Sequence, residues 1–499
     1  MRNRIYTLIL CGLLVMGNGC ADLDVPNPNN PDTERVLAKP DDLKGVVSGA
    51  FVSMYSIFGD ATNAYYANTN LEWTADYITM TNNVRAWWSQ FKIEPRVQFN
   101  NTLAFTDLDV VGRPFKQLHA AISSANDVIR AIETRGIQIG ANGAETPMVL
   151  ASAYFCKAMA QGYLANTFDR AYIVNPDDDP LTVPLSSYQD VMTASLANFD
   201  KVIELSTAST FTLPGNFINT AGGGYTNVKL ARLARTYAAN FMVQNARNRA
   251  ENALTNWDKV LEYTSNGLIE DYVINLDGAN WQNGLQSIAG LNWYWRVDHR
   301  VIRLMDPTYP KRFPLTANTY PKATSADKRL DLYFFYEPGL GFFRTDRGPQ
   351  LRSHYRFKRF DQLYTDAGVG PSPFLYAYTN DLLRAEALAM KGDLAGATAI
   401  LNAGKRVTVG ELPPIAGASQ AEVLATVFAE RDIELQLTDF AIHFKDMRRR
   451  DALQRGTILH FPVPANELAV VREQFYSYGG QGNADGKNTA DGSNSWLND

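Results

Sequence analysis

Aromatic residues gather with polar residues in two parts of the chain, and this combination suits the binding of a sugar. A sugar ring stacks its C–H face on an aromatic side chain, while amides and guanidinium groups bond to its hydroxyls. The aromatic residues of the two groups are Trp73, Trp87, Trp88, Trp281, Trp293, Tyr294 and Trp295. Their polar neighbours include Asn82, Asn83, Arg85, Gln90, Asn292 and Arg296. We expect a ligand site built from both groups, the alternative being that these tryptophans pack loops onto a scaffold.

Paired carboxylates offer a second kind of chemistry. Glu430 and Glu434 are one helical turn apart and share one helix face, as an acid–base pair could. Three arginines stand close by in the chain and favour ion pairing instead: Arg431, Arg448 and Arg449. We interpret the two glutamates as structural.

A catalytic alternative remains near the first aromatic group. Glu72 and Asp76 flank Trp73, and a glycoside hydrolase needs two such acids in an aromatic cleft. Nothing in their pattern distinguishes them from acids on a helix surface. The sequence predicts a protein that is not an enzyme, with a surface glycoside hydrolase as an alternative.

Two charged clusters have simple structural interpretations. The run Asp177-Asp178-Asp179 lies between prolines and predicts an exposed turn, although its oxygens could bind calcium. The basic residues at 445 and 448–450 alternate with acids and predict a solvated, paired helix face. No H-E-x-x-H motif occurs. We expect no metal and no cofactor, and the net charge of −5 does not favour nucleic acid.

The N-terminus indicates export and lipid attachment. Arg2 and Arg4 precede an apolar run at 5–16, which is too short to span a membrane but suits a signal peptide. Small residues lead up to Cys20, a position typical of a bacterial lipoprotein cysteine. We predict a signal peptide at 1–19 and a lipid on Cys20. The Pro/Asn-rich residues 20–40 form a lipidated tether, because proline disfavours helices and central strands.

Helical periodicity dominates the remaining chain. Helices are predicted at 113–134, 146–168, 187–205, 227–244, 256–266, 378–390, 394–406, 421–437 and 444–453. Gly392 and Asp393 suit the end of one helix and the cap of the next, as in a tetratricopeptide-like hairpin. Cys156 falls within an apolar helical pattern and is expected to be buried.

Long stretches without helical periodicity separate these helices. They cover 60–110, 208–225, 270–372 and 407–418, and the third is rich in aromatic residues. Long ordered loops often carry function. We expect a mostly α fold: one domain at 41–477, in which helical hairpins form a scaffold for aromatic-rich loops. Residues 478–499 form a Gly/Asn-rich irregular tail.

Several short motifs resemble the SusD/RagB family of outer-membrane lipoproteins. The strongest is the helical hairpin at 384–393, Arg-Ala-Glu-Ala-Leu-Ala-Met-Lys-Gly-Asp. The others, in order and at similar spacing, lie at 115–132, 323–329, 430–435, 444–449 and 461–468. The chain departs from the pattern after Glu434, where Gln436 to Phe440 replace the usual Glu-Gly-x-Arg-Trp, and its tail is longer.

This resemblance implies a function at the cell surface. Such a protein captures a nutrient, usually an oligosaccharide, and passes it to a SusC-like TonB-dependent transporter of the outer membrane. The resemblance implies a ligand site in loops of the two aromatic regions, and an anchor on Cys20 that faces the cell exterior. A tetratricopeptide-like scaffold without a ligand remains a further alternative.

Overall fold

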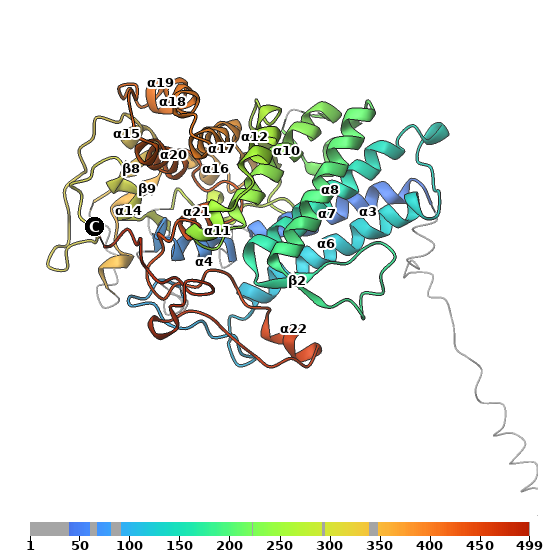
Figure 1. The fold of residues 1–499 in the computed structure, drawn as a ribbon, viewed down its shortest axis with the longest axis horizontal. Helices are drawn as coiled ribbons and strands as arrows, with labels where there is room; N and C mark the ends of the chain where they lie inside the picture. The colour runs from blue at the N-terminus through green and yellow to red at the C-terminus, as the bar shows by residue number, and fades with distance from the viewer. Residues whose placement is uncertain are drawn as a thin grey trace, which may run out of the picture.

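Helices dominate the regular structure of the described residues and pack side by side (Figure 1). The computed structural model describes residues 39–59, 67–80, 91–221, 223–291, 295–338 and 348–498. The longer helices are α3 (Asp42–Tyr55), α6 (Asp109–Glu133), α7 (Thr146–Thr167), α8 (Tyr188–Ala208), α10 (Asn227–Gln244), α12 (Trp257–Ser265), α17 (Ala377–Met390), α18 (Leu394–Ala403) and α20 (Gln420–Glu434). The mostly α fold predicted from the sequence is confirmed.

Helices α3, α6, α7, α8 and α10 form a bundle at the right of Figure 1. Helix α6 is amphipathic and buries one face, whereas α7 is buried almost all around because α3, α6, α8 and α10 contact it. Gly162 allows the close approach of α7 and α10, since a Cβ there would lie 2.0 Å from the Phe241 ring. Cys156 is buried in this bundle, as predicted.

The predicted hairpin is formed by α17 and α18, at the upper left of Figure 1. Gly392 follows α17 with a φ of 87°, a left-handed conformation that glycine adopts without strain. The Asp393 carboxylate then caps α18 by accepting the Gly396 N–H at 2.8 Å. Both predictions for this turn are confirmed.

In the described part of the chain, the strands form five two-stranded antiparallel pairs. They are β1 (Ile78–Met80) with β7 (Trp295–Val297), β2 (Arg170–Tyr172) with β3 (Leu185–Ser187), β4 (Thr212–Leu213) with β5 (Tyr225–Thr226), β6 (Tyr272–Leu276) with β10 (Gly370–Leu375), and β8 (Phe334–Tyr336) with β9 (Tyr355–Phe357). Two pairs, β1–β7 and β6–β10, join segments that are far apart in the sequence. These pairs hold the long interhelical stretches together.

Those stretches contain more regular structure than predicted. Short helices occur in or beside them: α4 (Ala67–Thr74), α9 (Gly215–Ile218), α13 (Gly284–Ser287), α14 (His299–Arg303), α15 (Arg329–Tyr333), α16 (Asp361–Thr365) and α19 (Lys405–Thr408). Helix α4 buries every one of its residues, including polar ones, so it lacks the one-sided apolar pattern that would have predicted it. Helix α3, near the N-terminal end of the described chain, was also not predicted.

The C-terminal residues pack against the body of the protein. Helices α11 (Arg249–Ala253), α21 (Ile442–Arg448) and α22 (Ala465–Val470) complete the helical set. Beyond them, residues 478–498 contain a single 3-10 turn, Gln481–Asn483. The Leu459 N–H donates to the Asn488 carbonyl at 2.9 Å, and the Ala490 N–H donates to the Thr457 carbonyl at 2.7 Å.

The N-terminal predictions fall outside the described residues. These cover the signal peptide at 1–19, Cys20 and all but the last two residues of the tether. Among the helices that the structure describes, none combines the length and the apolar character needed to cross a bilayer.

Candidate ligand-binding site

The β1–β7 pair joins the two parts of the chain that carry the predicted aromatic groups. Met80, the last residue of β1, is paired with Trp295, the first residue of β7. Paired residues of antiparallel strands lie about 5 Å apart. Residues 81–90 follow Met80, and residues 292–294 precede Trp295, so both segments leave the same end of the ribbon. Neither segment is among the described residues, but the ends from which they depart are.

The chain returns from residues 81–90 to the same ribbon. Lys92 follows closely and is fully buried, with its Nζ 2.6 Å from Asp76 Oδ1 and 2.7 Å from Asp298 Oδ2. Asp76 lies two residues before β1, and Asp298 directly follows β7. Both ends of the segment are therefore fastened at the β1–β7 pair, one by backbone pairing and the other by a buried lysine.

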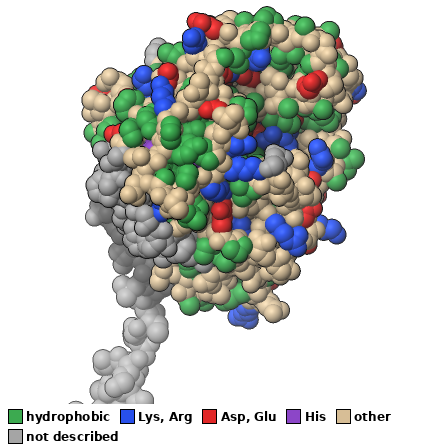
Figure 2. Space-filling view, turned by 90° about the vertical axis from the view of Figure 1, so that its left-hand side faces the viewer, with side chains coloured by type: hydrophobic (Ala, Val, Ile, Leu, Met, Phe, Trp, Pro, Cys, Tyr) green, Lys and Arg blue, Asp and Glu red, His purple; other side chains and the backbone are tan. Residues whose placement is uncertain are grey.

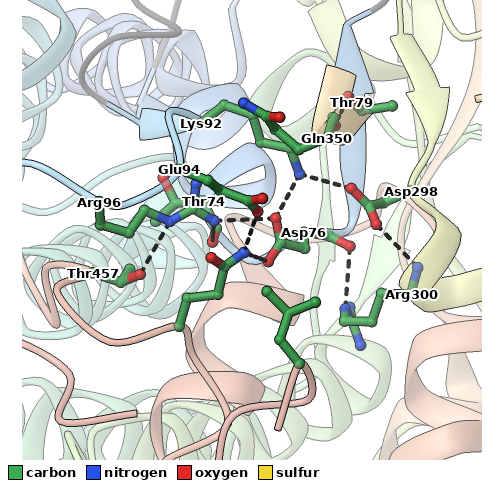
Figure 3. Close-up of polar contacts among 12 residues, drawn as sticks. Thr74, Asp76, Thr79, Lys92, Glu94, Arg96, Asp298, Arg300, Gln350 and Thr457 are labelled. Carbon is green, nitrogen blue, oxygen red and sulfur yellow. Dashed lines mark hydrogen bonds and ion pairs between the residues drawn. The ribbon is translucent and has the colours of Figure 1, made fainter. Parts of the chain in front are cut away.

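Asp76 is the centre of the charge network beneath this ribbon (Figure 3). Besides Lys92, its carboxylate accepts hydrogen bonds from Arg96 Nη2 at 3.1 Å and from Trp496 Nε1 at 2.9 Å. Gln454 Nε2 also donates to it at 2.5 Å. Burial alone would raise the pKa of Asp76, but the charges of Lys92, Arg96 and Arg312 together hold that pKa well below its usual range. Asp76 is ionised at neutral pH.

Arg300 extends the network toward the helical hairpins. It forms a bidentate pair with Asp432 of α20, at 2.7 and 3.0 Å, and its Nε donates to the Asp76 carbonyl at 3.2 Å. Although burial acts in the opposite direction, the Arg300 charge lowers the pKa of Asp432. The ribbon is thereby tied to the hairpin scaffold through buried ion pairs.

Four of the predicted site residues lie among the described residues, and all four are buried. Trp73 of α4 is 1 % exposed and packs edge-to-face on Trp295, with ring centroids 6.3 Å apart. Trp281 packs on Tyr55 at 5.1 Å. The side chain of Arg296 is buried and lies 3.1 Å from Glu337. In this structure all four side chains lie in the interior, and a role for them in ligand contact stays a prediction.

The other predicted site residues lie outside the described residues. They are Arg85, Trp87, Trp88, Asn292, Trp293 and Tyr294, together with the lipidation residue Cys20. All except Cys20 belong to the two segments that leave the Met80–Trp295 end of the ribbon. The contacts made by their side chains remain predictions.

The side of the protein that carries α14, α15 and β8 has a mixed chemical character. It lies at the left of Figure 1 and faces the viewer in Figure 2. Lys and Arg side chains gather near the middle of this face, beside hydrophobic side chains (Figure 2). Such a surface suits a ligand that has both apolar and hydrogen-bonding groups.

Glu430 and Glu434 are structural, but their partner differs from the predicted one. Arg329 of α15 contacts Glu430 at 2.7 Å and Glu434 at 2.9 Å, and it also pairs with Asp327. All of these side chains are at most 5 % exposed. The prediction missed Arg329 because it is about 100 residues away in the sequence. The arrangement fastens α15 to α20.

The prediction of a solvated face for the basic cluster is wrong. Lys445, Arg448 and Arg449 are fully buried. Arg449 pairs with Asp446 and Glu386, whereas Arg448 donates to three backbone carbonyls, those of Asn166, Gln244 and Leu459. Helix α21 lies inside the molecule, where Arg448 meets backbone carbonyls of other segments and Lys445 Nζ lies over the rings of Tyr163, Phe241 and Phe440.

The proposed catalytic acids are both engaged in buried contacts. Glu72 Oε2 lies 2.8 Å from His443 Nδ1, and Glu72 Oε1 accepts the His443 backbone N–H at 3.2 Å. A general acid needs a raised pKa, but the pKa of Asp76 is strongly lowered. This geometry gives no support to Glu72 and Asp76 as the acids of a glycoside hydrolase.

The aspartate run at 177–179 forms a turn, as predicted, and its first and last residues are exposed. The Asp178 carboxylate accepts the backbone N–H of Asn175 at 2.8 Å. Over the described part of the chain, no three His, Cys, Asp or Glu side chains are placed to hold a metal ion together.

Comparison with known proteins identifies the fold. No family model matches the sequence, and no curated protein matches it either. Among solved structures, a SusD superfamily protein from Bacteroides vulgatus matches at 15% identity and a TM-score of 0.60, covering 87% of this chain and 97% of its own.

Two structures from Bacteroides fragilis extend the match. A SusD-like protein has 14% identity and a TM-score of 0.63, covering 89% of this chain and 97% of its own. A SusD-like carbohydrate binding protein has 14% identity and a TM-score of 0.55, covering 83% and 86%. This chain therefore has the fold of SusD superfamily proteins, and the resemblance seen in the sequence motifs is confirmed for the fold.

Proposed function

Starting from the SusD-like fold, we propose that this protein captures an oligosaccharide at the cell surface. One observation carries the proposal: the Met80–Trp295 pairing, which makes the two predicted aromatic segments leave the same end of one ribbon. Trp87, Trp88, Trp293 and Tyr294 would stack on sugar rings there, and Arg85 and Asn292 would bond to hydroxyls. The similarity to a structure described as a SusD-like carbohydrate binding protein supports this ligand class.

The buried network below the ribbon explains how such a site would be held in place. Binding loses affinity when loops must be ordered first, so a rigid base favours recognition. Lys92, Asp76 and Asp298 fasten the ribbon at distances of 2.6–2.7 Å. The ligand segments would thus be presented by a scaffold that does not rearrange on binding.

The proposal includes a place in the cell. A lipid on Cys20 would anchor the protein in the outer membrane, facing the exterior, with residues 20–40 as a tether. The protein would deliver its ligand to a SusC-like TonB-dependent transporter and act as a lid over it. Mass spectrometry of the native N-terminus tests the anchor: we expect a lipidated peptide starting at Cys20, and an unmodified peptide starting beyond Cys20 would contradict it.

A double substitution tests the ligand site. In isothermal titration calorimetry against a panel of soluble polysaccharides, we expect the Trp87→Ala/Trp88→Ala variant to bind its best ligand at least tenfold more weakly than wild type. Each stacked ring contributes about 0.5–1.5 kcal/mol beyond burial, and 1.4 kcal/mol corresponds to a tenfold change in Kd.

Phe475→Ala is the matched control, because this ring is 39% exposed and lies outside both aromatic groups. It should bind with wild-type affinity. Equal affinities for the double variant and wild type would reject the site, and sustained release of reducing ends from a polysaccharide would favour a hydrolase.

A further inference from the structure

A cavity apart from the β1–β7 ribbon lies on the face of the helical bundle. It has a volume of about 350 Å³ and is formed by α6, the segment after β2 and the start of α22. None of its lining residues belongs to β1 or β7, or to the predicted aromatic groups. Small-molecule pockets start at about this size and combine apolar walls with a few polar groups. The sequence motifs did not predict this cavity, since its walls come from segments about 50 and 300 residues apart.

Three rings form one wall of the cavity. Phe115 and His119 stand one turn apart on α6, with ring centroids 4.4 Å apart, and Tyr172 of β2 lies 5.4 Å from His119. His119 Nδ1 lies 2.8 Å from the Phe115 carbonyl, and the Tyr172 backbone N–H donates to His119 Nε2 at 3.3 Å. This pattern requires a neutral imidazole protonated at Nδ1. Burial agrees with it, lowering the pKa of His119 to about 4.

Hydrogen-bond donors and acceptors complete the lining of the cavity. The Tyr172 hydroxyl donates to Glu467 Oε1 at 2.9 Å, which leaves the second oxygen of this carboxylate with capacity for a ligand hydroxyl. Lys116 is exposed at the cavity and supplies a donor. Asn126 is 3% exposed, and among the described residues its Oδ1 has no hydrogen-bond partner. A buried amide oxygen without a partner is costly, and it marks a place where a ligand or water would be stabilised.

We propose that this cavity is a second binding site, for a monosaccharide-sized polyhydroxylated ligand. The Phe115–His119–Tyr172 wall would take the C–H face of the ring, and Glu467 and Lys116 would bond to hydroxyls as acceptor and donor. A strongly charged ligand fits less well, because acids and bases line the cavity together. The choice of a sugar over another small polyol rests on the proposed function.

Saturation-transfer NMR on the full mature protein tests this site. The probes are D-glucose, D-galactose, D-mannose, L-fucose and N-acetyl-D-glucosamine at millimolar concentration. We expect at least one of them to show a transfer signal that falls to background in Ser123→Trp, which fills the cavity from α6. Asn466→Trp fills it from α22 and provides a second, independent block.

Matched variants separate this site from the ribbon site. Ala120→Trp places the same bulk on an exposed position of α6 that does not line the cavity, and it should keep the signal. The Trp87→Ala/Trp88→Ala variant should also keep it, even though it loses polysaccharide binding. If no probe gives a signal, or if the signal survives both cavity-filling variants, the second site is rejected. A signal lost only with Trp87 and Trp88 would assign the sugar to the ribbon site alone.

Discussion

The helical bundle and the β1–β7 region are held together by different interactions. In the bundle, α7 is enclosed by its neighbours, and alanines, valines and aromatic rings fill the interior. Around β1 and β7, buried ion pairs join the apolar packing: Lys92 joins Asp76 to Asp298, and Arg300 joins the ribbon to Asp432. The bundle can tolerate small changes in packing, whereas the ribbon region depends on charges that must remain paired.

The reliance of the β1–β7 region on buried ion pairs fits its proposed role in presenting the ligand segments. A short ribbon of three residues per strand has too few backbone hydrogen bonds to be stable alone. Buried ion pairs with good geometry fix the orientation of the ribbon, because each charged group must occupy one position to meet its partner. The region that is proposed to present the ligand segments is therefore the one in which losing one side chain should have the largest effect.

Asp76→Asn provides the strongest test of this comparison. It leaves Lys92 and Arg96 without one anionic partner in a buried site, and such losses cost about 3–5 kcal/mol. We expect a decrease of that size in the free energy of unfolding, measured by urea titration. Asparagine is the suitable replacement, because Asp76 has a φ of 53° and asparagine tolerates this conformation.

The control for Asp76 is Asp200→Ala on the bundle. Asp200 of α8 is exposed and accepts a hydrogen bond from the Tyr263 hydroxyl at 2.7 Å. Its loss should cost at most about 1 kcal/mol. Equal effects of the two substitutions would show that the ribbon region has no special dependence on its charges.

Acid should weaken the ribbon region through His299, which begins α14 two residues after β7. Burial lowers the pKa of His299 to about 4, with Asp298 opposing this shift and Arg312 and His354 adding to it. In the unfolded chain the pKa is about 6.5, so the unfolded state takes up the proton first as the pH falls. The contribution of His299 to the free energy of unfolding is therefore complete above pH ~6.5. It decreases by ~3 kcal/mol as the pH falls from 6.5 to 4.

His299→Asn should flatten that decrease. Asparagine can still donate to the Pro310 carbonyl, which His299 Nδ1 contacts at 2.9 Å, but it does not titrate. Urea unfolding from pH 7.5 to 4 compares the two proteins. Parallel pH profiles for wild type and variant would contradict the assignment.

A smaller effect is expected in the hairpin. Asp393→Ala removes the cap of α18 and should cost about 1 kcal/mol in the free energy of unfolding. Asp393→Asn keeps a capping oxygen and should remain close to wild type. If alanine and asparagine behave alike, the capping bond is not what stabilises this turn.

Four of the five helices of the bundle could be predicted from local pattern, whereas α3 was not predicted. The predicted 227–244 agrees with α10, and the predicted 146–168 agrees with α7 to within one residue. The Thr226 side chain caps α10, and Pro147 lies in the first turn of α7, where proline is favoured. Helix α4 could not be predicted, since it is buried on every side and its polar residues make remote contacts such as Glu72 with His443. The motif resemblance predicted the overall fold where periodicity alone predicted only its class.

The candidate site shows a similar division. The sequence identified the aromatic groups by composition, but it had no signal for the ion pairs of Lys92, Asp298 and Arg300. Lys92 and Asp298 are 206 positions apart, and Arg300 and Asp432 are 132 apart. Trp73 and Trp295 are of the residue type expected at a sugar site, but the structure places both in the interior. Aromatic residues serve cores and binding surfaces equally well, so their burial depends on what folds over them.

The sequence alone determined most of the long helices, the hairpin turn at Gly392 and Asp393, and the resemblance to a known fold. These features arise from contacts within a few residues, which local spacing records. The tertiary structure alone decided that Met80 pairs with Trp295 and that Asp76 meets Lys92, Arg96 and Trp496. These contacts join residues up to 420 positions apart, and the free energy of pairing charges depends on which groups burial brings together.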